Sequence, residues 1–388
     1  MIKSLIKRYS FQSITSILNL TLPLFIYTLV IGVAGDLVFG DFIFKVFVVN
    51  LLWILIDVNQ SVTGVIDLKN KGDIIISHII YSRLFLSILI FPIFLLFFCD
   101  SILYTSIIYL IVIGKSININ FYYIFLKKEK DFSVINLITR LGLLLLLYLL
   151  MGVSLLSFAI YLGVAEIIIS ILLIHNLKLR IFSVTFKIIF QQLKRNLNSG
   201  SFTFLSSCYS FVPIIFLKFY SPLSIADYSI LEKIFRGLSN ISAPINNILL
   251  VEKSNKNNLS LNKIYFFLFL FFGLILLSFF LLSDIIYPLL FKTLADESIY
   301  ALNLSLLIPL IVFVSRFLVI NIILDHQKDD LLPITYILTF IISIIINYIL
   351  LVEFDLAIIG SILSIICVET ICMLLLALSS KSILFNDK

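Results

Sequence analysis

The residues of this 388-residue sequence that could do chemistry are charged side chains that interrupt long apolar segments. Each such residue costs roughly 2.5 to 3.5 kcal/mol at the centre of a bilayer, so we expect them to face a polar interior and not lipid. Their number and mixed sign predict a water-filled path through a bundle of helices. The charges nearest the middle of apolar segments are Lys115, Glu166, Glu232, Lys233, Arg236 and Glu369.

The apolar segment around Lys115 carries further polar residues on the same predicted helical face. Asn118 and Tyr122 follow Lys115 at separations of three and four residues, which nearly close whole turns. A buried ammonium suits an anionic cargo, and Asn and Tyr can hydrogen-bond sugar hydroxyls. The alternative is a structural lysine paired with Glu166 or Glu369.

Arg140 and Asn136 lie one helical turn apart in the next apolar segment. A guanidinium binds phosphate in bidentate fashion, so Arg140 is a candidate contact for a pyrophosphate. The alternative is that Arg140 snorkels toward the cytoplasm. Snorkelling is the preferred interpretation for Arg83, Arg316 and Lys45, which lie near segment ends.

The segment that contains Glu232 combines both signs of charge within one turn. Glu232 and Arg236 have the i,i+4 spacing of a helical ion pair, which would neutralise one positive charge. Lys233 would then be the less compensated cation. We therefore rank Lys233 above Arg236 as a candidate for binding cargo.

The carboxylates of Asp57, Glu166 and Glu369 also lie within apolar segments. Proton-coupled carriers use intramembrane carboxylates as relays, so these residues are candidates for coupling to a gradient of H⁺ or Na⁺. The alternative, which also applies to Glu232, is that each carboxylate balances a nearby cation.

Several motifs of enzymes are absent from the sequence. It contains neither a G-x-x-x-x-G-K-[ST] loop for nucleotide phosphates nor an H-E-x-x-H metal site. Its four cysteines have no spacing typical of a zinc site, so we expect them to pack within helices. We therefore predict no catalytic residues, no metal and no cofactor, and we expect a transporter driven by an ion gradient or by the cargo gradient itself.

The composition predicts a polytopic, all-α membrane protein. Of the residues, 61% are hydrophobic and 13% charged, and the mean hydropathy of +1.17 lies far outside the range of soluble domains. A window of about 19 residues yields apolar segments long enough to cross a bilayer. The twelve predicted spans are 11–33, 43–66, 78–98, 101–125, 133–153, 155–175, 200–219, 226–251, 263–287, 299–322, 331–352 and 356–379.

The basic residues follow the positive-inside rule. Lys and Arg concentrate at the N-terminus, in alternate loops and at the C-terminus, whereas the opposite loops carry Lys218 and Lys292 among mostly acidic residues. This pattern places both termini in the cytoplasm. It also accounts for the net charge of +6 without a nucleic-acid partner.

The most polar stretch divides the chain into two blocks of six predicted spans. We expect an N-terminal lobe over 1–176, a basic cytoplasmic linker over 177–198 and a C-terminal lobe over 199–388. Because each block has an even number of spans, the lobes would be related by an axis along the membrane normal. The two lobes would surround a central cavity.

Three longer stretches carry a resemblance to a known family. They are FYYIFLKKEKDFSVINLITR, IADYSILEKIFRGLSNISAPINNIL and LVEFDLAIIGSILSIICVETICMLL, and IDVNQSVTG around Asp57 is a looser match. Together they resemble Wzx-type flippases of O-antigen and polysaccharide repeat units, in the multidrug/oligosaccharidyl-lipid/polysaccharide (MOP) exporter superfamily, to which the MATE transporters also belong. The sequence departs from that pattern at Val58, where the family usually has glycine, and before Glu129, where the customary Gln and Gly are absent.

The resemblance implies a flippase that moves an undecaprenyl-pyrophosphate-linked oligosaccharide across the bacterial inner membrane by alternating access of its two lobes. In that picture Lys115, Arg140, Lys233 and Arg236 attract the pyrophosphate or acidic sugars. Membrane lipids, an O-antigen polymerase and a chain-length regulator would be its partners. The alternatives are a drug exporter of the same superfamily and, with less support from the short outer loops, an O-antigen polymerase.

Overall fold

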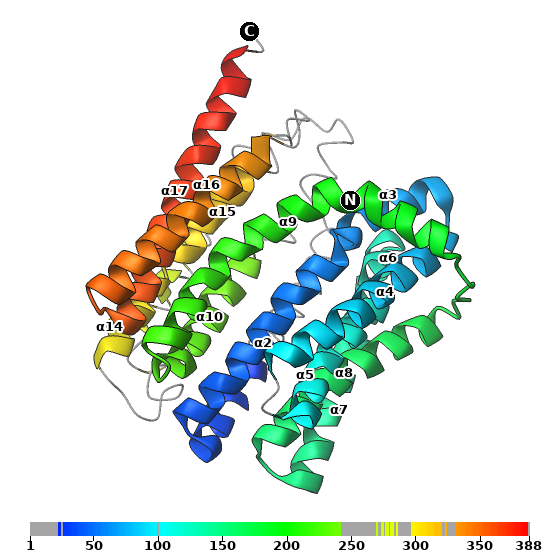
Figure 1. The fold of residues 1–388 in the computed structure, drawn as a ribbon, viewed down its shortest axis with the longest axis horizontal. Coiled ribbons are helices and arrows are strands. Elements are labelled where there is room, and N and C mark those ends of the chain that lie inside the picture. Colours follow the sequence, from blue (N-terminus) through cyan, green and yellow to red (C-terminus); the bar gives the residue numbers. More distant parts are fainter. Residues whose placement is uncertain are drawn as a thin grey trace. The chain divides into compact units, whose positions relative to one another are not determined.

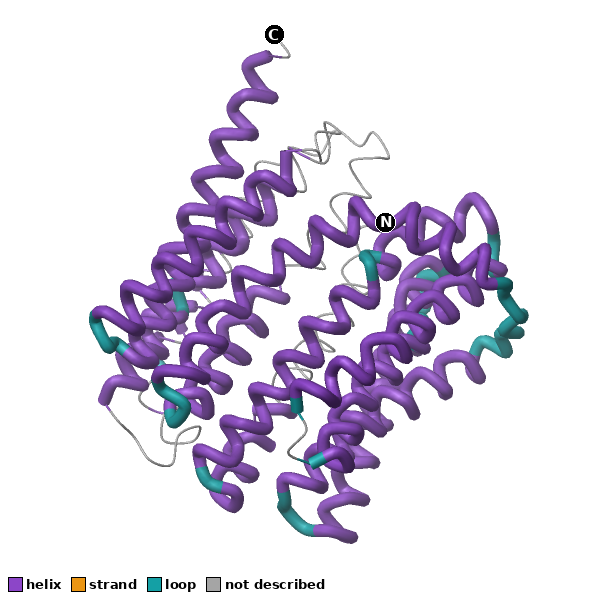
Figure 2. Tube along the Cα trace, in the orientation of Figure 1, coloured by secondary structure: helices purple, strands orange, loops and turns teal. Residues whose placement is uncertain are grey.

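The described part of the chain is helical throughout. The computed structural model describes residues 22–24, 26–98, 101–241, 269–270, 273–274, 276–278, 280–282, 285, 296–319, 323 and 331–386. Figure 2 shows these residues as helices joined by short loops, and none of them forms a strand. The prediction of an all-α protein is confirmed.

Nine helices among the described residues are long and apolar enough to cross a membrane, so the protein is a multi-pass membrane protein. Most of the predicted span 263–287, the beginning of 11–33 and the end of 226–251 lie outside the described residues. The total of twelve spans therefore stays a prediction. The nine candidate spans are Asp36–Asp57, Ile74–Phe97, Ile102–Phe125, Glu129–Met151, Leu155–Asn176, Thr203–Tyr220, Ile299–Leu318, Leu332–Glu353 and Ala357–Lys381.

Contacts divide the chain into two compact units. The first unit is Phe42–Ser207, and the second unit combines Met1–Asp41 with Cys208–Lys388. Helix α2 (Asp36–Asp57) begins in the second unit, where Lys218 forms an ion pair with Asp41. This division differs from the predicted lobes and linker, whose boundaries stay a prediction.

Two close helix contacts organise the first unit. Helices α5 (Ile102–Ile117) and α8 (Leu155–Asn176) pack side by side (Figure 1). A Cβ added at Gly114 would lie 2.5 Å from Glu166 Cβ, and one at Gly163 would lie 2.7 Å from the carbonyl oxygen of Ile107. Glycine lets the two backbones approach this closely, as is common between transmembrane helices.

Two predicted spans of the first unit are broken in the structure. Span 43–66 divides into α2 and α3 (Gln60–Lys71), because Val58 and Asn59 have φ of 44° and 57°. A left-handed backbone is rare for a β-branched residue, whereas glycine adopts it without steric cost. Span 101–125 divides into α5 and α6 (Asn120–Phe125), because Asn118 is extended.

The first unit is completed by α4 (Ile74–Phe97), α7 (Glu129–Met151) and the beginning of α9 (Phe186–Tyr220). Helix α9 is continuous over 35 residues and passes from the first unit into the second. Much of the predicted linker 177–198 is therefore helical, because α9 begins at Phe186. The predicted span 200–219 is the C-terminal part of this longer helix.

The second unit packs around the C-terminal helix α17 (Ala357–Asn386), which contacts α10 (Ser224–Ile241), α14 (Asp296–Ser305), α15 (Ile308–Leu318) and α16 (Leu331–Asn347). Helix α16 continues into a π-helical turn over Tyr348–Glu353.

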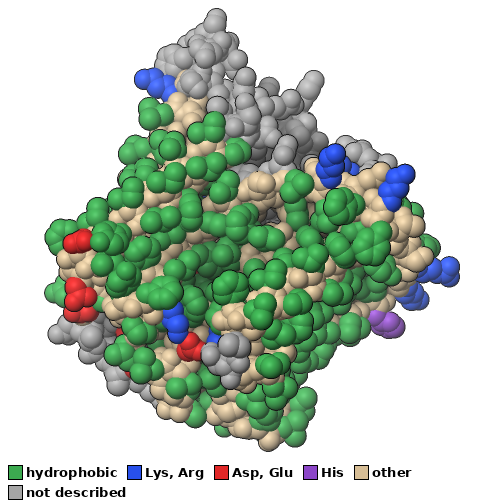
Figure 3. Space-filling model, viewed as in Figure 1, with side chains coloured by type: hydrophobic (Ala, Val, Ile, Leu, Met, Phe, Trp, Pro, Cys, Tyr) green, Lys and Arg blue, Asp and Glu red, His purple; other side chains and the backbone are tan. Residues whose placement is uncertain are grey.

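The surface fits a lipid environment. On the face drawn in Figure 3, hydrophobic side chains cover most of the described area. Large apolar residues are among the most exposed, with Leu96 80% and Phe97 79% exposed. A transmembrane helix presents such side chains to acyl chains.

Candidate functional site: buried charges in each unit

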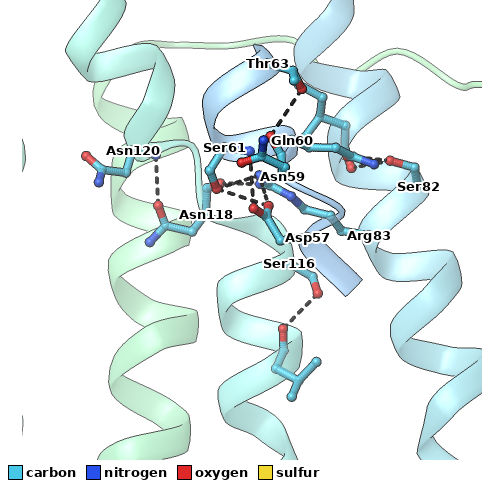
Figure 4. Close-up of polar contacts among 12 residues, drawn as sticks. Asp57, Asn59, Gln60, Ser61, Thr63, Ser82, Arg83, Ser116, Asn118 and Asn120 are labelled. Atoms are coloured by element: carbon cyan, nitrogen blue, oxygen red, sulfur yellow. Dashed lines mark hydrogen bonds and ion pairs between the residues drawn. The ribbon is translucent and has the colours of Figure 1, made fainter. Parts of the chain in front are cut away.

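One charge cluster of the first unit forms at the break between α2 and α3 (Figure 4). The Arg83 guanidinium lies 2.5 Å from the Asp57 carboxylate, and its side chain is 1% exposed. Ser61 donates to the same carboxylate from its backbone nitrogen at 3.3 Å and from its hydroxyl at 3.0 Å. Asp57 thus both pairs with a cation and fixes the first turn of α3.

Arg83 also bridges the two helix breaks. Its Nη1 donates to the backbone carbonyl of Asn118 at 3.1 Å, and its Nη2 donates to Ser61 Oγ at 3.0 Å. The rings of Trp53 and Phe121 lie 5.4 and 5.5 Å from the guanidinium. The prediction that Arg83 snorkels is wrong, because Arg83 lies about two and a half turns after the start of α4 at Ile74 and its side chain is buried.

Arg140 forms the second charge cluster of the first unit. Its Nη2 donates to Glu166 Oε1 and its Nε donates to Asn136 Oδ1, both at 2.6 Å. The side chains of Arg140 and Glu166 are 16% and 14% exposed. Two of the donor atoms of Arg140 therefore bond within the protein. This pairing favours the interpretation that Glu166 balances the charge of Arg140 over the interpretation that it carries a proton. The pyrophosphate contact of Arg140 stays a prediction.

Lys115 donates from its ammonium to the side-chain oxygen of Asn50 at 2.8 Å. Glu166 pairs with Arg140, and the alternative of a structural lysine paired with Glu166 or Glu369 stays a prediction. The predicted polar face that continues through Asn118 and Tyr122 is absent, since the helix ends at Ile117.

Asn118 and Tyr122 have structural partners. The Asn118 side chain accepts from the backbone nitrogen of Asn120 at 2.8 Å, which stabilises the start of α6. The Tyr122 hydroxyl donates to Asp73 at 2.8 Å, and its ring is buried in the core. Neither side chain is arranged with Lys115 as the sequence predicts, and their contact with sugars stays a prediction.

The second unit places its charges on α10. Glu232 and Arg236 form the predicted i,i+4 ion pair, and Glu232 is 2% exposed. Lys233 is only partly buried and has no hydrogen-bond or ion-pair partner among the described residues of the chain. The pairing thus leaves Lys233 as the less compensated cation, as expected from the spacing.

Glu369 on α17 is the centre of the other cluster of the second unit. It is 8% exposed and accepts a hydrogen bond from the Tyr209 hydroxyl at 3.0 Å. The Tyr209 ring stacks on Tyr336, with centroids 6.2 Å apart and planes within 10°. Arg236 and Arg316 both act electrostatically on Glu369.

Arg316 and Lys45 are also held inside their units. Arg316 donates to the backbone carbonyl of Ser239 at 2.8 Å and to the Asn240 side chain at 3.1 Å. Lys45 is 4% exposed and lies 5.8 Å from the Phe98 ring, so snorkelling, which the sequence favoured for it as well, is wrong there. The contacts of both residues come from a different segment of the chain. The apolar pattern of a single span cannot predict such contacts.

Sequence reasoning missed several polar partners, among them Asn50, Tyr209 and Ser61. Asn50 interrupts an apolar run of α2, which was a usable signal of a buried amide. The sequence gives no signal for Tyr209, because tyrosine is common in aromatic-rich spans. Only the structure shows that its hydroxyl donates to Glu369. Within the described ranges, no group of three or more His, Cys, Asp or Glu residues could hold a metal ion.

These features define a multi-pass, all-α membrane protein with two compact units and charge clusters inside each unit. No protein-family model matches the chain, and no curated protein matches it. Solved structures do match, over nearly the whole chain.

Three of these solved structures illustrate the likeness. The lipid II flippase MurJ in an inward closed conformation has a TM-score of 0.69 and 16% identity, covering 97% of this chain and 87% of MurJ. An inward-facing multidrug resistance MATE family transporter of the MOP superfamily has a TM-score of 0.66 and 15% identity, covering 93% of each chain. The eukaryotic MATE transporter AtDTX14 has a TM-score of 0.62 and 13% identity, covering 96% of this chain and 95% of that one. The protein therefore has the two-lobed fold of these transporters.

Proposed function

We propose that this protein is a flippase for an undecaprenyl-pyrophosphate-linked oligosaccharide, such as an O-antigen repeat unit. It would act in the bacterial inner membrane, with both termini in the cytoplasm. The fold is compatible with this role, because one of the similar structures is a lipid II flippase. The same fold also occurs in multidrug transporters, so the choice between the two depends on the charges.

The observation that carries the proposal is which buried charged groups have partners within the protein and which do not. Each of the four carboxylates that the sequence predicts as ion-coupling or charge-balancing already accepts from a protein donor. The pairs are Asp57 with Arg83, Glu166 with Arg140, Glu232 with Arg236 and Glu369 with Tyr209. Lys233, in contrast, has no hydrogen-bond or ion-pair partner in the described ranges.

This distribution suits an anionic cargo better than a cationic drug. A cationic drug would have to displace an arginine or a tyrosine from a carboxylate, which leaves a buried charge or donor unpaired. A pyrophosphate would instead supply negative charge to Lys233 without displacing a protein donor. Lys115 remains a candidate cargo contact, and Arg140 and Arg236 would contact a cargo only if it competes with their carboxylates.

Transport would proceed by alternating access, with the two lobes rocking about the cargo. The energy would come from a gradient of H⁺ or Na⁺ or from the cargo gradient. Among the carboxylates, Glu369 is the candidate for proton coupling, because its hydrogen-bond partner is a neutral hydroxyl and not an arginine. An O-antigen polymerase and a chain-length regulator would receive the flipped product.

The experiment reconstitutes the purified protein in liposomes and measures two activities side by side. One is the translocation of a fluorescent undecaprenyl-pyrophosphate-linked oligosaccharide, and the other is the uptake of an organic cation such as ethidium. We expect translocation of the lipid-linked glycan and no cation uptake above protein-free liposomes. Cation uptake without glycan translocation would establish the drug exporter instead.

A further inference from the structure

The first half of α9 has an unusual distribution of side chains. Phe186 is 68%, Phe190 67% and Leu197 55% exposed, whereas Gln192 and Asn196 are 4% and 2% exposed. The buried face therefore combines two amides with Ile189, and the outer face combines large apolar side chains with Lys187, Lys194 and other polar residues. Apolar residues interspersed with lysines on an outer face are typical of a helix that lies against lipid at the membrane surface.

The length of α9 gives a reason for this distribution. The helix has 35 residues, or about 52 Å at 1.5 Å per residue. This exceeds the roughly 30 Å of the hydrocarbon core. Only Thr203–Tyr220 is apolar enough to be a candidate span, so residues 186–202 extend beyond it.

A groove of about 660 Å³ lies along this extension, within the first unit. Pockets of roughly 300 to 1,000 Å³ accommodate small-molecule ligands. Residues of α9 line the groove at spacings of three and four, including Lys194, Leu197 and Phe204, and they face Val58 of the α2–α3 break and Leu86 of α4. The lining is apolar apart from Lys194 and Ser201.

The two neighbouring cations of α9 differ in their partners. Arg195 forms an ion pair with Asp67 of α3, which holds the helix against the unit. Lys194 is exposed and has no hydrogen-bond or ion-pair partner among the residues that the structure describes. An apolar groove thus carries a single available ammonium on its lining.

We propose that this groove binds an anionic phospholipid, with one acyl chain along the apolar lining and the headgroup phosphate at Lys194. The apolar walls match a hydrocarbon chain and the ammonium matches the phosphate, whereas nothing on the lining favours a zwitterionic headgroup's cation. The bound lipid would hold the first half of α9 at the membrane surface. This inference does not depend on which cargo the protein carries.

The test uses tryptophan fluorescence, because the sequence has a single tryptophan, Trp53. The variant Trp53→Phe/Phe190→Trp places the only indole beside the groove, in nanodiscs that contain brominated phosphatidylglycerol or brominated phosphatidylcholine at equal mole fraction. We expect stronger quenching by phosphatidylglycerol. Adding Lys194→Ala should lower its relative binding constant about fivefold, the effect of one lysine near an anionic surface.

Lys187→Ala is the matched control, because Lys187 is an exposed lysine of the same helix that does not line the groove. It should keep the preference for phosphatidylglycerol within a factor of about two. A second variant, Ser201→Phe, should fill the groove and reduce quenching by both lipids. Equal quenching by the two lipids, or equal losses in the Lys187 and Lys194 variants, would overturn the proposal, as would displacement of the lipid by equimolar undecaprenyl phosphate.

Discussion

The two units deal with buried charge in different ways. In the first unit, Arg83 and Arg140 pair with carboxylates on other helices, so each ion pair also joins two elements. In the second unit, Arg236 pairs with Glu232 on its own helix, and the neighbouring Lys233 has no hydrogen bond or ion pair with another described residue. Interhelical pairs hold a fold together, whereas an intrahelical pair leaves the neighbouring cation available. Removing charges from the two units should therefore have different consequences.

The largest loss of stability is expected from Arg83→Ala. It would leave the Asp57 carboxylate buried without a cation and remove the donor to Asn118, at a cost of about 3 to 5 kcal/mol. The measurement is the thermal unfolding midpoint of the purified protein in detergent. The double variant Asp57→Asn/Arg83→Met should regain much of the loss, and a single variant as stable as wild type would remove the structural role of this pair.

Arg140→Ala should cost less, about 1 to 3 kcal/mol, because both partners are partly exposed. The double variant Arg140→Ala/Glu166→Ala separates a structural role from cargo binding. A structural pair predicts that the double variant recovers both stability and glycan translocation. Recovered stability with lost translocation would instead make Arg140 a cargo ligand. Buried charges of the first unit would then also bind cargo, and the proposed difference between the two units would not hold.

Tyr209→Phe should have the smallest effect on stability. It removes only the hydrogen bond to Glu369 and keeps the ring that stacks on Tyr336, so we expect a loss of about 0.5 to 1.5 kcal/mol. If Glu369 carries the coupled proton, the same variant should also shift the pH dependence of translocation. An unchanged pH profile together with unchanged stability would show that this contact does neither.

Much of the fold was predictable from the sequence, because apolar segments of about 20 residues leave little choice but transmembrane helices. The Glu232–Arg236 pair was predictable as well, since both residues lie on one helix at a spacing that brings them together. The interruption of α2 was not predicted, because Val58 itself favours a regular helix or strand.

The long-range pairs could not be predicted in the same way. Periodicity predicts which face of a helix is buried but not which helix packs against that face. Arg83 was therefore assigned to a span end, although it pairs with Asp57 of α2. The prediction that Lys115 and Tyr122 share one helical face was wrong for a related reason. The carbonyl of Asn118 bonds to Arg83 and its side chain starts α6, and these tertiary contacts accompany the end of the helix.

The central claim is that Lys233 is an available cation for an anionic cargo, and charge-conserving substitution tests it most directly. The measurement is the initial rate of glycan translocation in liposomes for Lys233→Arg, Lys233→Gln and the exposed-lysine control Lys130→Ala. We predict near wild-type rates for Lys233→Arg and Lys130→Ala, and a loss of about tenfold or more for Lys233→Gln, equivalent to one charge-assisted hydrogen bond of roughly 1.5 to 3 kcal/mol. Wild-type translocation by a stably folded Lys233→Gln protein would contradict the account.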